Sequence, residues 1–427
     1  MNHLIKFFTS LRLTVTLLAL GILLVFVGTV AQADEGLYQA QERYFKHWFV
    51  WGITMFGYKI PLPLPGGYLI GTTLLVNLTA AHIKRFQFTT KKLGIQLTHL
   101  GVILLLVGQL TTDIFSRETQ LRFEEGQSKS WSESSMEYEL AFITDAGTNA
   151  ERVVTIPQSL VARGGEVRHA ELPFVVQVKS YWRNSEPAFR APMQENRPPL
   201  ATNGVALSYD FQEAAVTHKM DEKNVPTALI ELIAPGGSIG SWVASGWAGD
   251  DIMASAVERS FKRQMGNQMA ASMAAKLRSP QTVTVGGRGY TFTFRPARAY
   301  KPYSLTLLKA THSIYPGTQT SAMPEGIPKD FRSRVRIQNP GAGEDREVEI
   351  YMNSPLRYGG LTYYQYQMVG EEMAAQYGES RSSTLQVVRN PSWLTPYAGC
   401  LVVAAGMITQ FMIHLVGFIT KRKAQTV

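Results

Sequence analysis

Four strongly apolar segments limit what this chain can fold into, because a helix needs about 20 apolar residues to cross the ~30 Å core of a bilayer. These segments cover residues 11–30, 68–83, 93–112 and 394–419. The second segment is short and crosses only by recruiting flanking residues. The sequence therefore predicts a multi-pass α-helical membrane protein with four transmembrane helices, three of them in a membrane region over residues 1–112 and the fourth, with a basic tail, over residues 394–427.

Basic residues next to these segments indicate their orientation. They precede the first segment, fill the link between the second and third, and follow the fourth: Lys6, Arg12, Lys84, Arg85, Lys91, Lys92, Lys421, Arg422 and Lys423. Because basic loops stay in the cytoplasm, we expect both termini to be cytoplasmic and residues 113–393 to be extracytoplasmic, in a bacterial plasma membrane. The same rule explains the net charge of +9, so nucleic acid is not an expected partner.

The first apolar segment has two interpretations. It ends in VAQADE, where Ala31 and Ala33 fit a signal-peptidase site, so it could be a cleaved signal peptide. Its apolar run is longer than the usual core of a signal peptide, which favours a retained helix. Beyond it, residues 37–60 place Tyr44, Trp48 and Trp51 on one helical face. This pattern predicts an aromatic helix at the outer interface of the membrane.

Residues 113–393 have the composition of an extracytoplasmic, mainly-β domain. Short runs rich in valine, threonine and aromatic residues alternate with Gly, Pro and Asn turns, at residues 174–182, 281–296, 304–317, 331–339, 346–353, 361–368 and 383–390. We expect sheets that pack face to face. The period changes between Asp251 and Arg278, where Met265, Met269 and Met273 predict a helical insertion of one helix. The methionines are interpreted as packing residues rather than haem ligands.

Glycines recur every seven residues in three of the apolar segments: Gly21 and Gly28, then Gly94, Gly101 and Gly108, then Gly399 and Gly406. Seven residues are about two helical turns, so each set lines one face on which helices can pack closely. His99 lies two residues from Gly101 and is expected to face away from that packing surface.

Three histidines are expected in the inner half of the membrane: His82, His99 and His414. An ionisable side chain inside a membrane helix marks a functional site by default, because burying it without a partner is costly. For His99 a ligand or proton-relay role is favoured over a simple hydrogen bond to a neighbouring helix. For His82 and His414 an ordinary interfacial position is favoured.

The residue types in the chain limit which ligand His99 can bind. Cys400 is the only cysteine, so the chain cannot form an internal disulfide, a thiolate metal site or a CxxCH haem attachment. Haem takes an axial imidazole and an apolar slot, which makes it the best match. No GxSxG, HExxH or Walker motif is present. The outer histidines His169, His218 and His312 are expected in ordinary surface or core positions.

Four stretches in the same order are similar to the ResB family, also called CcsB, of system II cytochrome c biogenesis. SLRLTVTLLALGILLVFVGTVAQ resembles its first helix, and THLGVILLLVGQL resembles its His-Leu-Gly pattern. Outside the membrane, YPGTQTSAMPEGIPKDFRSRVRI and EIYMNSPLRYGGLTYYQ resemble its two most recognisable stretches. The motif residues of these stretches are Tyr315, Pro316, Gly317, Asn353, Pro355, Gly360, Tyr364 and Gln365.

The resemblance implies a function in haem delivery. Such proteins act with a ResC/CcsA-type membrane protein to carry haem b outward and present it for covalent attachment to apocytochrome c. His99 would then be an axial ligand to the haem iron, with lower support for His82 and His414, and the partner would supply the other ligand. The chain alone is not expected to be an enzyme, because the bond-forming step belongs to the partner.

Two other functions remain open. In the first, the chain is a membrane-anchored scaffold or chaperone whose intramembrane histidines bind no haem. In the second, it is a cytochrome b-type electron carrier that pairs His99 with His414 or His82. Histidines in one layer argue against the carrier, since electron transfer across a membrane needs iron near both faces.

Overall fold

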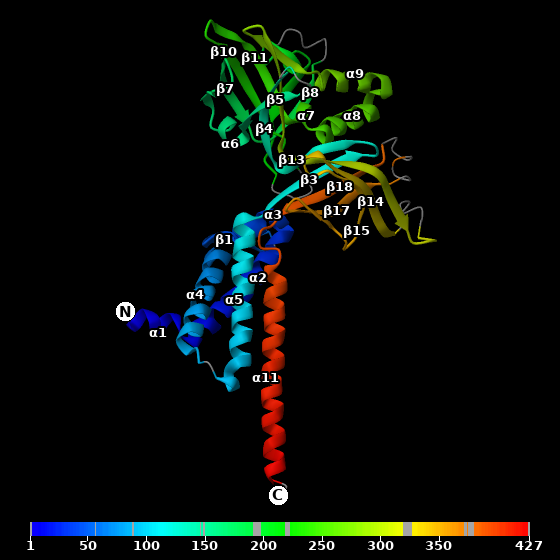
Figure 1. Cartoon of the computed structure of the whole chain (residues 1–427). Helices are drawn as coiled ribbons and strands as arrows, with labels where there is room; N and C mark the ends of the chain where they lie inside the picture. Colours follow the sequence, from blue (N-terminus) through cyan, green and yellow to red (C-terminus); the bar gives the residue numbers. More distant parts are fainter. Residues whose placement is uncertain are drawn as a thin grey trace.

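The computed structural model describes residues 2–55, 57–87, 89–145, 147, 150–190, 198–217, 223–318, 327–370, 374 and 380–425. A bundle of helices forms one end of the molecule and a β-rich region forms the other (Figure 1). The long helices of the bundle are α2 (Leu11–Glu35), α4 (Gly67–Arg85), α5 (Leu93–Phe115) and α11 (Thr395–Gln425). The short helix α1 (Asn2–Phe8) precedes them.

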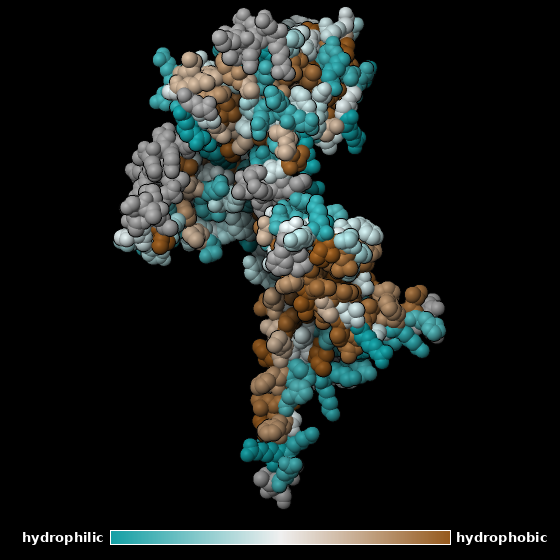
Figure 2. Space-filling model, turned by 180° about the vertical axis from the view of Figure 1, so that it is seen from behind, coloured by the Kyte–Doolittle hydropathy of each residue, from teal (hydrophilic) through white to brown (hydrophobic). Residues whose placement is uncertain are grey.

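Three helices in the described residues are long and apolar enough to cross a membrane, at Leu11–Glu35, Thr90–Phe115 and Thr395–Lys423. Helix α4 is not among them, since Asn77, His82, Lys84 and Arg85 all fall within its 19 residues. The prediction of four crossings therefore stays a prediction, whereas the apolar helices and the mainly-β region are present. Hydrophobic surface gathers over the bundle, and hydrophilic surface covers the far end of its longest helix (Figure 2).

The predicted glycine faces hold α5 and α11 together. A Cβ added to Gly101 would lie 2.6 Å from Val403 Cγ2 and 2.9 Å from the carbonyl oxygen of Gly399. Gly94 and Gly108 face Gln410 and Thr395 of α11 in the same way. All three glycines of α5 are buried, so the helices approach closely along their length.

The residues after α2 form a β-hairpin, so the predicted interfacial helix over residues 37–60 is wrong. Helical structure is limited to α3 (Leu37–Ala40) and a π-helical turn (Gln41–Phe45). Strands β1 (Phe49–Met55) and β2 (Tyr58–Pro65) then pair in antiparallel fashion. The physical reason is backbone chemistry: alternate prolines in β2 suit a strand without further partners, and Gly52 and Gly57 adopt positive φ angles that a helix does not contain. The aromatic side chains Trp48 and Trp51 are nevertheless exposed.

Antiparallel strands dominate the region between α5 and α11. They are β3 (Arg117–Glu124), β4 (Ser128–Asp145), β5 (Glu151–Pro157), β6 (Gly165–Val167), β7 (Val175–Trp182), β8 (Ser185–Phe189), β9 (Tyr209–Glu213), β10 (Thr227–Ala234), β11 (Gly237–Ser245), β12 (Gln281–Val285), β13 (Arg288–Ile314), β14 (Pro328–Asn339), β15 (Glu344–Tyr351), β16 (Leu356–Tyr358), β17 (Leu361–Val369) and β18 (Ser382–Arg389). Each of the seven runs predicted as strands overlaps at least one strand of this set.

In the described residues, the β region contains two large sheets, a two-stranded sheet of β8 and β9, and three clusters of buried apolar side chains. The larger sheet has the order β15-β14-β13-β4-β3-β18-β17-β16, with β12 on β13 and β5 on β4; the smaller has the order β11-β10-β7-β6. Where the sheets face each other, Trp242 of β11 meets Phe292 of β13 with ring centres 5.8 Å apart. A second core, which includes Leu305, Ile337 and Leu385, belongs to the larger sheet alone. The long strand β13 contributes to both cores.

The helical insertion consists of α7 (Gly246–Gly249), α8 (Asp251–Met265) and α9 (Asn267–Leu277). The prediction of one helix from Asp251 to Arg278 is therefore wrong. Gly266, with φ of 83°, interrupts it between Met265 and Met269. Only Met273 is buried, whereas Met265 and Met269 are exposed, so the methionines do not form one stripe.

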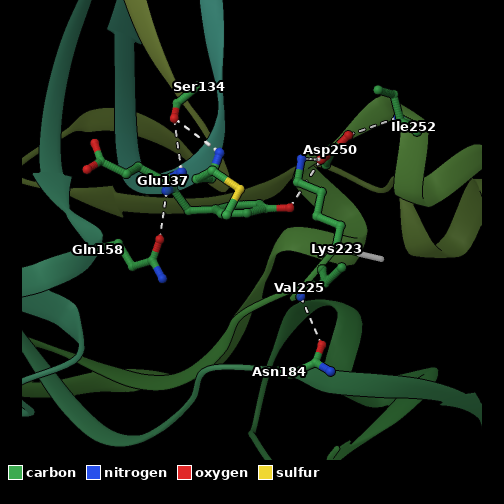
Figure 3. Close-up of polar contacts among 10 residues, drawn as sticks. Ser134, Glu137, Gln158, Asn184, Lys223, Val225, Asp250 and Ile252 are labelled. Atoms are coloured by element: carbon green, nitrogen blue, oxygen red, sulfur yellow. Dashed lines mark hydrogen bonds and ion pairs between the residues drawn. The ribbon is translucent and has the colours of Figure 1, made fainter. Parts of the chain in front are cut away.

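Asp250 fixes the start of α8 against the sheet. Its Oδ1 accepts a hydrogen bond of 3.0 Å from the backbone N–H of Ile252, and its Oδ2 lies 2.6 Å from Lys223 Nζ (Figure 3). Tyr138 of β4 donates a hydrogen bond to the same Oδ2. Burial together with the nearby carboxylate of Asp250 raises the pKa of the Tyr138 hydroxyl well above its usual range, so Tyr138 stays a donor.

The helices and the larger sheet are joined directly. Ser116 alone separates α5 from β3, and β18 leads through a short turn into α11. Strands β3 and β18 are neighbours in the sheet, just as α5 and α11 are neighbours in the bundle. Ser392 in the turn bonds Thr112 of α5 with an Oγ–Oγ1 distance of 2.7 Å.

Candidate functional site

His99 lies near the start of α5, and its side chain is exposed on the protein surface. Its Nδ1 lies 2.8 Å from the carbonyl oxygen of Ile95, one turn earlier in the helix. A carbonyl only accepts hydrogen bonds, so Nδ1 carries the proton and Nε2 keeps its lone pair. Metal-binding histidines commonly hold their second nitrogen in this way.

The structure brings His99 next to His82, on the last turn of α4. The two ring centres are 6.3 Å apart, and the ring planes are inclined by 32°. The glycine face of α5 turns toward α11, so His99 points away from that helix and toward α4. The expected orientation relative to the glycine face is therefore the one found.

The two imidazoles line a cavity of about 330 Å³ between α2, α4 and α5. Its other lining side chains include Thr14, Asn77, Leu78, Arg85, Lys92 and Gln96. His82 also lines an adjacent hollow of about 230 Å³, whose walls include Phe86, Leu97 and Leu100. Apolar walls therefore lie on one side of His82, and a cavity with a mixed polar and apolar lining lies on the other.

The charged lining of this cavity is basic. Arg85 Nη2 donates to the carbonyl oxygen of Thr9 at 3.1 Å, and Lys92 Nζ donates to Gln87 Oε1 at 2.5 Å. Asp and Glu are absent from its lining among the described residues. The cavity therefore combines imidazoles with cationic groups, a combination that attracts an anionic ligand.

Asn77 holds α4 in position for His82. Its side chain is 1% exposed. Its Nδ2 donates to the carbonyl oxygen of Phe8 at 2.7 Å, and its Oδ1 accepts from Thr14 Oγ1 at 2.7 Å. A buried amide with partners on both groups fixes the rotation of α4 against the first helices.

His414 lies apart from this pair. Its Nε2 is 2.9 Å from Gln410 Nε2, one turn earlier in α11. Gln410 is level with Gly94 at the start of α5, so His414 lies beyond that end of α5. In the described part of the chain, no ring contact joins His414 to His82 or His99.

These residues fit haem better than a free metal ion. The described residues contain no group of three or more His, Cys, Asp or Glu side chains that could hold a metal. Haem iron needs only axial ligands from the protein. His99 offers a free Nε2, the hollow beside His82 offers apolar walls, and Arg85 and Lys92 offer cations for the propionates of a porphyrin.

The family model of the ResB-like family matches residues 281–378. In this stretch, which runs from β12 to β17, the chain is similar to the ResB-like family. This similarity indicates a part in cytochrome c biogenesis and, together with the apolar helices, association with a membrane. No curated protein matches the chain.

The ResB-like region contains the eight motif residues expected from the sequence. Several of them form turns: Gly317 and Gly360 have φ of 75° and 74°, and Asn353 is the one non-glycine residue with positive φ in the described chain. Tyr315 closes the loop before β14, where its N–H donates to the carbonyl oxygen of Ile327. Pro316 follows it, and Pro355 precedes β16.

Gln365 of the ResB-like region links strands across the sheet. Its Oε1 accepts from Ser333 Oγ at 2.6 Å, and its Nε2 donates to Ser383 Oγ at 3.2 Å. Tyr364 beside it is exposed. The motif residues thus shape turns and strand contacts of the outer region, and they lie apart from the histidine pair on the membrane helices.

The outer histidines differ in their surroundings. His169 Nδ1 accepts a hydrogen bond from the backbone N–H of Glu171, and His218 lies outside the described residues. His312 stacks on Phe331 with ring centres 4.5 Å apart, and its buried Nε2 has no hydrogen-bond partner among the described residues. It lines a cavity of about 420 Å³ between β13, β14, β17 and β18.

Sequence reasoning missed the polar lining of the membrane cavity. The sequence pattern does not single out Asn77, and it indicates Arg85 and Lys92 only as orientation signals. The spacing offered one indication, because Arg85 follows His82 by three residues and so shares its helical face. The approach of α4 to α5 depends on tertiary contacts that no local pattern contains.

Proposed function

We propose that this chain is the haem-binding membrane subunit of a system II cytochrome c biogenesis complex. With a ResC/CcsA-type partner, it binds haem b in the membrane and helps deliver it outward for attachment to apocytochrome c. One observation carries the proposal: the Nδ1–H of His99 is held by a helix carbonyl, which leaves Nε2 to ligate iron beside a basic cavity.

The chain's own residues would bind and orient the haem. His99 would supply a nitrogen ligand to the iron. Arg85 and Lys92 would attract the propionates of the porphyrin. The haem would be the cargo, and the apolar hollow walled by Phe86, Leu97 and Leu100 would contact its ring.

The positive-inside rule supports the proposed orientation. With both termini in the cytoplasm, the inner cavity receives haem from the cytoplasmic half of the membrane and the β region lies outside. This layout requires α4 to complete a fourth crossing. It also places the ResB-like region on the side where apocytochrome c receives haem.

The β region would act as a frame for the partner and the apocytochrome. The outer site and the bond-forming step belong to the partner in this proposal. The shaped turns at Gly317, Asn353 and Gly360 give the frame a fixed surface, which suits docking better than catalysis.

The decisive experiment compares haem absorption spectra of the chain co-purified with its partner. Wild type, His99→Ala and His99→Ala with added imidazole are measured, and His414→Ala serves as the matched control because it also replaces a membrane histidine. We expect the haem signal to fall in His99→Ala, to return with imidazole, and to be unchanged in His414→Ala.

Other results would favour the alternatives. A haem-free wild-type complex, or a spectrum that ignores His99→Ala, would favour the scaffold. Haem that remains on the complex when reduced apocytochrome c is added, while cycling between redox states, would favour the electron carrier.

A further inference from the structure

The imidazoles of His82 and His99 lie close to each other, which bears on the residues that would ligate haem iron. We infer that His82 is the second axial ligand while this chain holds haem alone, and that a ligand from the partner replaces it in the complex. This inference rests on the proposed function. It adds a loading state, in which the chain alone holds haem through His82 and His99 before the partner binds.

The distance between the imidazoles supports one shared iron. A metal–imidazole nitrogen bond is about 2 Å long, so two imidazoles on opposite sides of one metal have ring centres about 6 Å apart once the radius of each ring is included. The ring centres of His82 and His99 are 6.3 Å apart. The two side chains come from different helices, so their approach is set by the tertiary structure.

The imidazole of His82 is available for coordination. In the described part of the chain it has no hydrogen-bond partner, and its one ring neighbour besides His99 is Phe86, at 5.8 Å. Phe86 also lines the apolar hollow beside His82. A neutral imidazole between an apolar wall and a second imidazole suits an iron ligand.

The helices that hold the two imidazoles are fixed at both ends. At the inner end Asn77 binds α4 to the first helices, and at the outer end Tyr68 of α4 donates a hydrogen bond to Asp113 of α5. The position of α4 beside α5 is therefore set by contacts of the bundle.

The basic residues complete the site on the same helices. Arg85 lies three residues after His82 on α4, and Lys92 directly precedes α5. In the described residues, neither side chain forms a salt bridge within this cavity, whose lining lacks acidic groups. Their charges are thus available to propionates of a haem held between the two histidines.

The test uses the full-length chain purified without its partner and reconstituted with haem b. Electron paramagnetic resonance and absorption spectra are recorded for wild type, His82→Ala, His82→Met and His414→Ala. We expect a low-spin bis-imidazole signal in wild type and in His414→Ala. We expect His82→Ala to become high-spin and to return to low-spin with added imidazole.

His82→Met guards against a change caused only by misfolding. Methionine also ligates haem iron, and His/Met ligation raises the reduction potential relative to bis-histidine ligation. We therefore expect this variant to stay low-spin with a higher midpoint potential. In the complex with the partner, the spectrum should be the same with or without His82.

The outcomes separate this inference from the proposed function. The loading state would be overturned if the His82→Ala chain, without its partner, kept an unchanged low-spin spectrum. It would also be overturned if the chain bound haem only with the partner present. Both results would leave haem delivery intact. Absence of haem from both the isolated chain and the complex would overturn the proposed function. A complex that still needs His82 would overturn the replacement by a partner ligand.

Discussion

Lys301 shows how one buried amine in the β region couples stability to pH. Its Nζ donates to Ser132 Oγ at 2.7 Å and to the carbonyl oxygen of Ala299 at 3.1 Å. These contacts accept hydrogen bonds but carry no full negative charge. Burial therefore lowers the pKa of Lys301 to about 8, from an ordinary value of 10.5.

The sign of the effect follows from proton binding. Between pH 8 and 10.5 the unfolded chain holds a proton on this lysine that the folded chain has released, so the contribution of Lys301 to the free energy of unfolding rises with pH in this window. Below pH 8 the charged form makes the folded state less stable. Lys301→Met should remove this contribution and make the protein more stable at pH 7.

Denaturant unfolding of wild type and Lys301→Met in detergent, at several pH values from 7 to about 10, checks this expectation. The difference in stability between them should shrink as the pH rises. A difference that stays constant or grows with pH would show that the amine is not the cause.

At the scale of an element, Asp250 anchors the helical insertion by three contacts. It caps α8, pairs with Lys223 and accepts from Tyr138. Its side chain is 4% exposed. Asp250→Ala should lower the free energy of unfolding by about 3 kcal/mol, because it leaves the Lys223 ammonium partly buried without its carboxylate and removes a helix cap.

Thermal unfolding and limited proteolysis within α8 measure this effect. Asp251→Ala is the matched control, since Asp251 lies in the first turn of α8 and is exposed. It should cost no more than about 1 kcal/mol. Equal losses in the two variants would mean that the contacts of Asp250 contribute nothing beyond a charge near the helix start.

The packing of α5 on α11 makes a second prediction at this scale. Gly101→Leu would place a side chain where even a Cβ meets Val403 at 2.6 Å. We expect the helices to separate and the free energy of unfolding to fall by about 1–3 kcal/mol. Gly417→Leu is the control, because nothing lies within 4 Å of a Cβ there.

Melting temperature in detergent and haem content should both decrease in Gly101→Leu, since α5 holds His99. An unchanged melting temperature would show that close approach at Gly101 is not needed for the helix pair.

Residue patterns within single segments predicted those helices and strands whose structure depends on neighbouring residues in the sequence. The glycine repeat of α5 and the valine-rich runs of the β region carry their own periods, and the structure contains the corresponding helix contact and strands. The spacing of side chains gave a wrong prediction where glycine and proline decide the backbone conformation. Aromatic spacing indicated a helix over residues 37–60, but Gly52, Gly57 and the prolines of β2 favour a hairpin. For the candidate site, His99 was predictable from its place in α5, whereas its neighbour His82 depends on how Asn77 orients α4.

At the scale of the whole molecule, the proposed orientation can be tested by thiol labelling. Cys400→Ser removes the single native cysteine. Gly236→Cys in that background places a thiol in the turn between β10 and β11, where nothing lies within 4 Å of a Cβ. Lys421→Cys places one at the basic end of α11.

A membrane-impermeant maleimide added to intact cells should label position 236 and leave position 421 unlabelled until the membrane is opened. The Cys400→Ser parent should stay unlabelled throughout. The opposite pattern at the two positions would reverse the orientation and place the His82–His99 pair near the outer face.

The direct joints between α5 and β3, and between β18 and α11, have a mechanical consequence. Two adjacent helices continue into two adjacent strands, and Ser392 bonds Thr112 across the joint. Two such links restrict rotation of the β region relative to the helices. A single flexible link would leave that rotation free. The β region therefore keeps a fixed orientation relative to the helix bundle. A rotation of α11 against α5 would tilt β3 and β18, which follow and precede these helices.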